Sequence, residues 1–330
     1  MGEFIDVIKV LVSPIEKLID VVGNGIGKLY EPCHKRKMAD ATAYEIETIA
    51  KSMDATDMLI VYDQNGVRVD MGDFTRLMER TATRMMAQEA IKQNNIERVI
   101  DNAYEMLATQ DECSADPVEQ GWINRFFDSV ADVSDEDLQN IWGKVLAGEI
   151  VHPKSYSLRT LETLKNLSKH EAELFQKIAP YILSLNGNLF LPSNKELLRK
   201  SGITYKDVLT LDECGLINSG GLVSITQLVT DKEPVGVHNS SKVIVLNSLG
   251  KSEVNISIGI YGLTKAGSEL LQIVDCQYNS AHDEYIYDFA QEIVKHNPNK
   301  IKAAVYKIEL IDINGISYES TALREFPAKK

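Results

Sequence analysis

The chain has 330 residues, which is too long for one small domain and fits two or three. Hydrophobic residues make up 44% and charged residues 25%, a mix that excludes disorder, collagen or a continuous coiled coil as the dominant state. Asp and Glu number 48 against 35 Lys and Arg, so the formal net charge is −13. A chain this acidic is a poor overall partner for nucleic acid.

The cysteines and the N-terminus indicate a cytoplasmic protein. The four cysteines are widely separated, and no pair has the spacing of a zinc or redox motif. Acidic Glu3 and Asp6 stand where a signal peptide would carry basic residues. No apolar run approaches the ~20 residues that a membrane helix needs. We therefore expect a cytoplasmic location, with peripheral contact at the inner membrane as the closest approach to lipid.

The N-terminal segment combines an apolar helix with a basic cluster. Residues 13–16, Ser-Pro-Ile-Glu, form a strong helix start, because serine caps, proline fits the first position and glutamate completes a capping box. An apolar stripe follows at helical spacing, and residues 34–37 are basic. Such a helix suits contact with its own protein, with a second copy or with an anionic membrane. The residues predicted for membrane or oligomer contact are Phe4, Ile15, Leu18, Ile19, Val22, Gly23, Ile26, Gly27, Leu29, Lys35, Arg36 and Lys37.

Three glycines interrupt this helix without forming a phosphate-binding loop. Three residues rather than four separate Gly23 from Gly27, and Leu29 rather than Ser or Thr follows Lys28. Gly23 and Gly27 instead have the spacing that lets two helices approach closely.

Residues 38–112 predict two helices separated by a β-hairpin. Residues 38–55 predict the first helix. Residues 58–62 and 67–69 predict strands, joined at Asn65-Gly66 by a type I′ turn. Residues 73–110 contain no proline or glycine and carry apolar residues at helical spacing, so they predict a long helix.

The next stretch predicts a compact helical domain, and residues 111–117 form the acidic linker before it. Two amphipathic helices carry Trp122 and Trp142. Residues 156–167 predict a third helix, and a capping box at residues 168–171 opens a fourth helix toward Ile182.

After Pro180 the pattern becomes that of a winged helix-turn-helix followed by a small α+β tail. A short strand at 188–191 precedes two helices, near residues 193–201 and at 204–214. Strands at 221–228, 242–248 and 254–260 and a closing helix at 268–274 follow. The tail predicts a helix at 283–296 and strands at 302–311 and 316–320.

The helix at 204–214 would read DNA if this region bound a duplex, but it is acidic. Asp207, Asp212 and Glu213 oppose a single Lys206, whereas phosphate contact needs Lys and Arg. A structural or protein-contact role is therefore favoured, and nucleic-acid binding is the alternative. The residues chosen to test such contact are Lys195, Arg199, Tyr205 and Lys206.

The sequence predicts no catalytic, metal or cofactor site. No histidine lies at ligand spacing from a cysteine, and His170-Glu171 is not followed by a second histidine four residues later. No nucleophile elbow is present. An enzyme of unrecognised type stays open as a hypothesis, and it requires a polar pocket with perturbed titratable groups.

Five motifs stand out along the chain: WINRFF at 122–127, DLQNIWGKVLAGEI at 137–150, SLRTL at 157–161, GIGKLYEP at 25–32 and LTKAGSELL at 263–271. Together they resemble an uncharacterised bacterial family of domains of unknown function, the one numbered 2806. This resemblance covers most of the chain and implies no established activity. Residues 122–167 also resemble, more loosely, the abortive-infection alpha family, which implies a setting in antiphage defence without catalytic residues to carry over.

The sequence therefore predicts an α+β fold, mainly α. It has helical N-terminal and middle regions, a winged-helix-like domain and a small α+β C-terminal unit. The expected parts are an amphipathic helical segment at 1–56, a hairpin plus long helix at 57–112, a compact helical domain at 113–185, the winged-helix-like domain at 186–275 and the tail at 276–330.

The leading functional hypothesis is a non-enzymatic antiphage protein that self-associates and contacts membranes through its N-terminal helix. Its expected partners are a second copy, a membrane surface, or a phage or host protein, and no cofactor is expected. A nucleic-acid-binding or protein-binding regulator using the winged-helix-like domain is the alternative.

Overall fold

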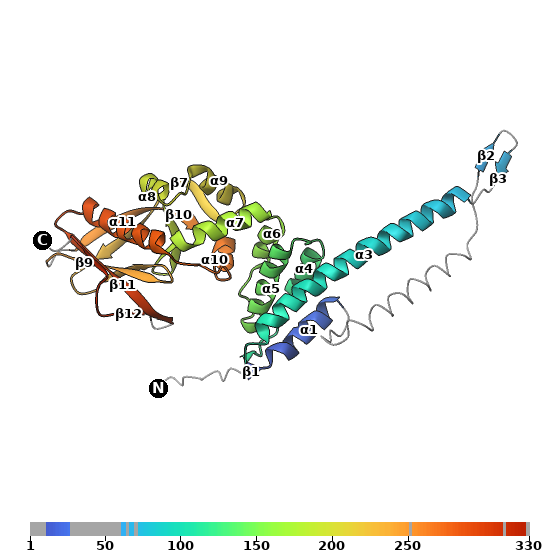
Figure 1. Cartoon of the computed structure of the whole chain (residues 1–330), viewed down its shortest axis with the longest axis horizontal. Helices are drawn as coiled ribbons and strands as arrows, with labels where there is room; N and C mark the ends of the chain where they lie inside the picture. The colour runs from blue at the N-terminus through green and yellow to red at the C-terminus, as the bar shows by residue number, and fades with distance from the viewer. Residues whose placement is uncertain are drawn as a thin grey trace, which may run out of the picture. The chain divides into compact units, whose positions relative to one another are not determined.

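A computed structural model of the chain describes residues 11–26, 61–63, 66–68, 72–250, 253–312 and 315–327 (Figure 1). The chain forms two compact units, unit 1 over residues 1–161 and unit 2 over residues 162–330. The fold is α+β and mainly α, as the sequence predicts. No helix in the described ranges is both long and apolar enough to cross a membrane.

Unit 1 is a set of helices around one apolar core. The predicted hairpin is present, but Gly66 pairs with Asp63 and so lies in the second strand and not in the predicted Asn65-Gly66 turn. A second two-stranded pair joins β1 to β4, with Val12 opposite Cys113. The predicted helix at 38–55 lies outside the described residues. The elements are β1 (Leu11–Val12), α1 (Pro14–Ile26), β2 (Val61–Asp63), β3 (Gly66–Arg68), α3 (Gly72–Leu107), β4 (Cys113–Ser114), α4 (Gln120–Val130), α5 (Glu136–Val151) and the start of α6 (Leu158–Lys165).

Aromatic side chains form the centre of this core. Trp122 stacks on Phe126 at 5.0 Å between ring centroids, and Phe126 meets Trp142 edge to face at 5.4 Å. The Trp122 indole nitrogen donates to the backbone oxygen of Tyr156 at 2.8 Å, which satisfies its buried polar group. Both tryptophans therefore lie in unit 1, in the core between α4 and α5.

Unit 2 is built on one antiparallel sheet of nine strands. The strand order is β12-β11-β9-β8-β5-β6-β10-β7, and β13 pairs with β11. The elements are α7 (Lys169–Ile178), a 3₁₀ turn (Ala179–Tyr181), β5 (Leu183–Leu185), β6 (Asn188–Pro192), α8 (Lys195–Lys200), α9 (Tyr205–Glu213), β7 (Ile217–Val229), β8 (Val235–His238), β9 (Lys242–Ser248), β10 (Val254–Leu263), α10 (Lys265–Leu271), α11 (Ser280–His296), β11 (Ile301–Asp312), β12 (Gly315–Tyr318) and β13 (Arg324–Phe326).

The predicted fourth helix is shorter than expected. Ser168 and Glu171 form the predicted capping box of α7, but the helix ends at Ile178 rather than near Ile182. Pro180 has no amide hydrogen to continue the helical bonding, so the chain makes a 3₁₀ turn and enters β5.

The start of β7 and α10 are joined by a close backbone approach. Thr264 caps α10, and its hydroxyl donates to the backbone oxygen of Gly215 at 2.6 Å. A Cβ on Gly267 would lie 1.9 Å from the backbone oxygen of Leu216, so this position requires glycine. The motif at 263–271 is therefore explained by packing.

The tail adds its strands to the same sheet as residues 186–275, the region predicted to be winged-helix-like. β11 pairs antiparallel with β9, with Ala303 opposite Leu246. Helix α11 packs against β11, and Tyr285 donates from its buried hydroxyl to the backbone oxygen of Tyr181 at 3.0 Å. Residues 186–275 and 276–330 therefore share one sheet, while their division into separate domains remains a prediction.

Candidate interaction surfaces

Helix α1 carries the described part of the predicted N-terminal contact surface, and it packs into unit 1. Leu18 and Val22 are completely buried, where α1 meets α4 and α5. Of the other predicted contact residues, Ile15, Ile19, Gly23 and Ile26 are half-buried. The described stripe is therefore largely core of its own unit. The predicted contact residues outside the described ranges are Phe4, Gly27, Leu29, Lys35, Arg36 and Lys37.

A glycine in α1 allows it to approach α4 closely. A Cβ on Gly25 would lie 2.1 Å from Cδ2 of Phe127 and 2.9 Å from Cγ2 of Ile123. Both side chains belong to the buried core. In α1 the glycine at the close helix contact is thus Gly25. The sequence had indicated its neighbours Gly23 and Gly27 instead.

Lys17 is a buried lysine on α1 that the sequence reasoning missed. Its Nζ donates to the backbone oxygen of Ser114 at 2.6 Å and to that of Ile150 at 2.8 Å. Ile150 lies in the last turn of α5, where helical carbonyls lack amide partners and a cation is favourable. Burial lowers the pKa of Lys17 from its ordinary value. The amine therefore holds α1, β4 and the end of α5 together.

The first half of α3 leaves the core and exposes an apolar stripe. No side chain from Arg76 to Asn94 is buried, and we call this stretch the arm. Met78 and Met85 precede buried Val99 by three and two heptads, so they continue the face that packs on α5. Large apolar side chains are exposed along the arm, at 51% for Leu77, 42% for Met78, 56% for Met85 and 59% for Ile91. The arm is the candidate surface for an apolar partner.

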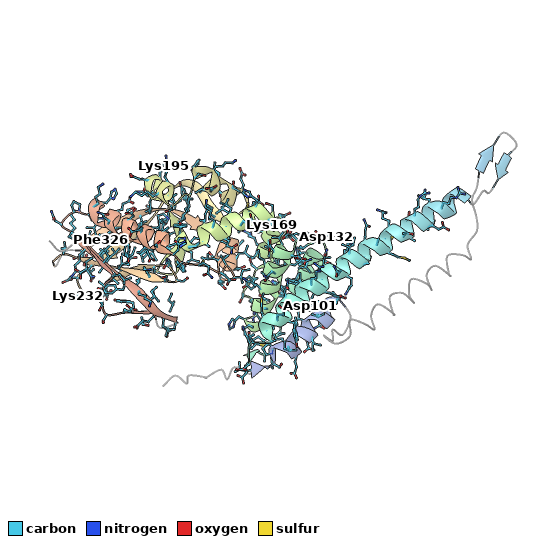
Figure 2. The ribbon with its side chains drawn as sticks, in the orientation of Figure 1. Asp101, Asp132, Lys169, Lys195, Lys232 and Phe326 are labelled. Atoms are coloured by element: carbon cyan, nitrogen blue, oxygen red, sulfur yellow. The ribbon has the colours of Figure 1, made fainter. Side chains whose placement is uncertain are left out.

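The candidate nucleic-acid residues lie on α8 and α9 of unit 2. Lys195 is exposed on α8, as Figure 2 shows, and Arg199 follows it one turn later. On α9, Lys206 is exposed and Tyr205 is 62% exposed. All four predicted residues are thus exposed on these two consecutive helices.

The acidic residues of α9 have structural roles. The Asp207 carboxylate accepts from the backbone amide of Thr204 at 2.8 Å and completes a capping box. Asp212 accepts from the Ser219 hydroxyl at 2.5 Å. Both carboxylates lie on the same helix as exposed Lys206 and Tyr205, and their charge opposes phosphate binding by this helix.

A cavity of about 450 Å³ in unit 2 brings several titratable groups together. Its lining includes His238, Ser240, Cys276 and Tyr278. Burial raises the pKa of Cys276 and of Tyr278, so both groups keep their protons at neutral pH. A thiol is a weaker nucleophile than a thiolate, so this environment does not activate Cys276.

Cys214 is held in its protonated form as well. Burial and a hydrogen bond to Glu171 raise the pKa of Cys214 to about 12. Within the ranges that the structure describes, no three His, Cys, Asp or Glu side chains come together as a metal site.

The fold defines an α+β protein of two units. A family model described as "Protein of unknown function (DUF2806)" matches residues 79–288. The match covers more than half of the chain, so the chain belongs to this family. The motifs at 122–127, 137–150, 157–161 and 263–271 lie inside the matched range, and the motif at 25–32 lies outside it. The match gives no support to the looser resemblance to the abortive-infection alpha family. The matched range runs from the arm on α3 to α11 of unit 2. No curated protein and no solved structure matches the chain.

Proposed function

We propose that the protein is a non-enzymatic binding protein that self-associates through the arm of α3. The observation that carries this proposal is one apolar stripe of α3, whose members between Ile96 and Leu107 are buried in unit 1 and whose members Met78 and Met85 are exposed. Exposed apolar side chains that form a continuous face mark a contact surface for another protein. A helix in which the same stripe continues past its packed half suits pairing with a second helix.

The charge of the arm favours a second copy of this chain as the occupant. Residues 76–92 carry four basic side chains and two acidic ones, whereas the whole chain has a formal net charge of −13. As two copies approach one another, each mildly basic arm is attracted to the acidic remainder of the other copy, which offsets part of the repulsion between the two chains. The apolar stripe then supplies the contact area.

Antiphage defence is the setting that we propose for this self-association. It is supported by the resemblance of residues 122–167 to the abortive-infection alpha family.

Membrane contact stays part of the proposal for Phe4, Leu29 and the basic cluster at Lys35, Arg36 and Lys37. Deleting residues 2–37 is a poor test of it, because α1 supplies buried Leu18 and Val22 and the deletion would open the core of unit 1.

The test replaces two methionines of the stripe and compares them with a matched pair on the opposite face. Met78→Glu with Met85→Glu places two charges on the apolar stripe, and Thr83→Glu with Ala90→Glu places the same charges, with the same seven-residue spacing, on exposed positions about 140° around the helix. We expect the mass in solution to fall for the first variant and to stay unchanged for the second, with equal helix content by circular dichroism. Equal masses for wild type and both variants would contradict self-association through the arm.

Phage plating on cells that express the same variants tests the biological setting separately. We expect protection in the wild type and in the control variant, and at least a tenfold loss of protection in the methionine variant. If the wild-type protein restricts none of the phages tested, the antiphage setting is contradicted. Self-association would still be decided by the mass measurement.

We propose protein binding by the winged-helix-like region as a second candidate. It is supported by the strand order β6-β10-β7 beside α8 and α9, and by exposed Tyr205 and Leu209 on α9. We expect no DNA binding at low salt. Steeply salt-dependent binding that is lost when Lys195, Arg199 and Lys206 become alanine would replace this candidate with a nucleic-acid-binding role.

A further inference from the structure

Strand β7 forms an open edge of the nine-stranded sheet. It stands at the end of the strand order and pairs with β10 at Ile217–Asn218 and again at Val223–Val229, with residues 219–222 outside the paired register. After a bulge near Gly262, residues Val223–Val229 of β7 pair one to one with residues Val254–Ile260 of β10. An edge strand of this length presents a row of backbone amides and carbonyls to any strand that approaches.

The side chains of β7 show that its inner face is incompletely covered. Ile260 on β10 is 9% exposed, whereas its partner Val223 on β7 is 49% exposed. In the next pair on this face, Ile258 is buried and Ile225 is half-buried. On the other face, Leu228 is 42% exposed. Apolar side chains on β7 are therefore more exposed than their partners on β10, and a further strand beside β7 would cover them.

The opposite edge of the sheet carries the protection that β7 lacks. There β11 is flanked by the short strands β12, of four residues, and β13, of three. Arg324 of β13 pairs with Glu284 at 3.3 Å, and Lys307 pairs with Glu319 at 3.4 Å. Short strands and charges are the usual protection against edge-to-edge pairing. β7 is 13 residues long and contains no charged residue and no proline.

We infer that β7 is a dimerisation edge at which a second copy of this chain adds its own β7 antiparallel. Two copies with a formal net charge of −13 repel one another, and contact along an uncharged strand buries no charge from either. A two-fold axis through Thr226, the middle of the regular segment, places Val223 opposite Val229 of the second copy. The strand is thus complementary to itself, as a two-fold interface requires.

The same axis places each Thr226 directly opposite its symmetry mate. Opposed side chains in an antiparallel pair have Cβ atoms about 4.5–5.5 Å apart. Thr226→Lys would therefore set two positive charges against one another at the axis. Ser257→Lys is the matched control, because exposed Ser257 is the cross-strand partner of exposed Thr226 on interior strand β10.

The experiment measures mass in solution for the full chain by light scattering over a range of concentration and salt. We expect Thr226→Lys to weaken association at least tenfold and Ser257→Lys to leave it unchanged. Association of the wild type should strengthen as salt rises, because salt screens the repulsion between acidic copies. A Thr226→Lys variant with wild-type association would overturn the inference.

A cross-linking measurement covers the case in which the lysine variant fails to fold. Under mild oxidation we expect Thr226→Cys to join two copies, while Ser257→Cys gives no more cross-linked product than wild type. Equal cross-linking of the two variants would also overturn the inference.

This edge is independent of the arm, and combined variants separate the two. Two isologous surfaces on one chain build assemblies larger than a dimer. We expect the arm variant and Thr226→Lys each to reduce the wild-type assembly to a dimer, and the combination to give the single-chain mass of 36.8 kDa. A full loss of association in the arm variant alone would assign association to the arm and overturn the inference for β7.

Discussion

The two halves of α3 have the same kind of apolar stripe and different surroundings. In the second half, Val99, Ile100 and Leu107 are completely buried. In the first half, Met78 and Met85 lie on the same face and are 42% and 56% exposed. The difference comes from α5, which packs against the second half of the helix. Helical periodicity therefore identifies a contact face, and the neighbouring elements decide whether that face is already occupied.

The largest expected effect contrasts one residue from each half. Ile100→Ala opens a cavity in a packed site and should lower the free energy of unfolding of unit 1 by about 3 kcal/mol. Met85→Ala removes a side chain that is 56% exposed and should change it by less than about 0.5 kcal/mol in dilute solution. Urea unfolding followed by tryptophan fluorescence measures unit 1, which contains both tryptophans. An equal loss of unfolding free energy in the two variants would show that Met85 is packed against other parts of the same chain.

A second contrast tests whether α1 belongs to the packed region. Gly25→Ala places a methyl group against Phe127 and should cost unit 1 about 2 kcal/mol through overpacking. Gly121→Ala, on an exposed face of α4 with its nearest neighbour 3.5 Å from the new Cβ, should stabilise it by about 0.5 kcal/mol. The same fluorescence measurement reports both. A neutral Gly25→Ala would mean that α1 is not docked on α4 in solution.

The smallest effect is a pH dependence confined to unit 2. Nδ1 of buried His282 accepts from the backbone amide of Asn279 at 3.0 Å, and the ring meets Tyr181 edge to face. Burial lowers the pKa of His282 below its ordinary value of 6.5. The folded state therefore binds fewer protons than the unfolded state just below pH 6.5, so the stability of unit 2 should fall as the pH drops through that value.

Denaturation followed by circular dichroism at pH 7.5, 6.5 and 5.5 measures this dependence, with tryptophan fluorescence as the internal reference for unit 1. His282→Gln should flatten the dependence of unit 2. His170→Gln, at an exposed histidine, should leave it in place. A dependence that persists in His282→Gln would assign the proton to another group.

Long periodic elements were predictable because their own residues define them. The predicted helix at 73–110 is α3 at Gly72–Leu107, and the predicted tail strand at 302–311 is β11 at Ile301–Asp312. The short strands β5, β8 and β13 were not predicted. A strand of three or four residues carries little periodicity, and β5 forms because β6 and β8 pair with it.

The apolar character of the N-terminal stripe was predictable from the sequence, but whether its side chains are free to contact a partner was not. The stripe containing Leu18 and Val22 is apolar as predicted, and the structure buries both side chains. The sequence reasoning passed over Lys17, because the charge of a lysine suggests exposure. Its value to the fold depends on backbone oxygens at Ser114 and Ile150, which are 97 and 133 residues away.

The sequence by itself determined the mainly helical α+β character, the long helix, the capping box of α7 and the family, since these depend on local periodicity and on short motifs. The tertiary structure decided which stripes face the core, why Gly25 and Gly267 must be glycine, and which edge of the sheet stays open. The physical reason is the sequence separation between the residues that interact. Helix formation depends on residues three or four apart, whereas burial and strand pairing depend on segments that are distant in the chain and that only folding brings together.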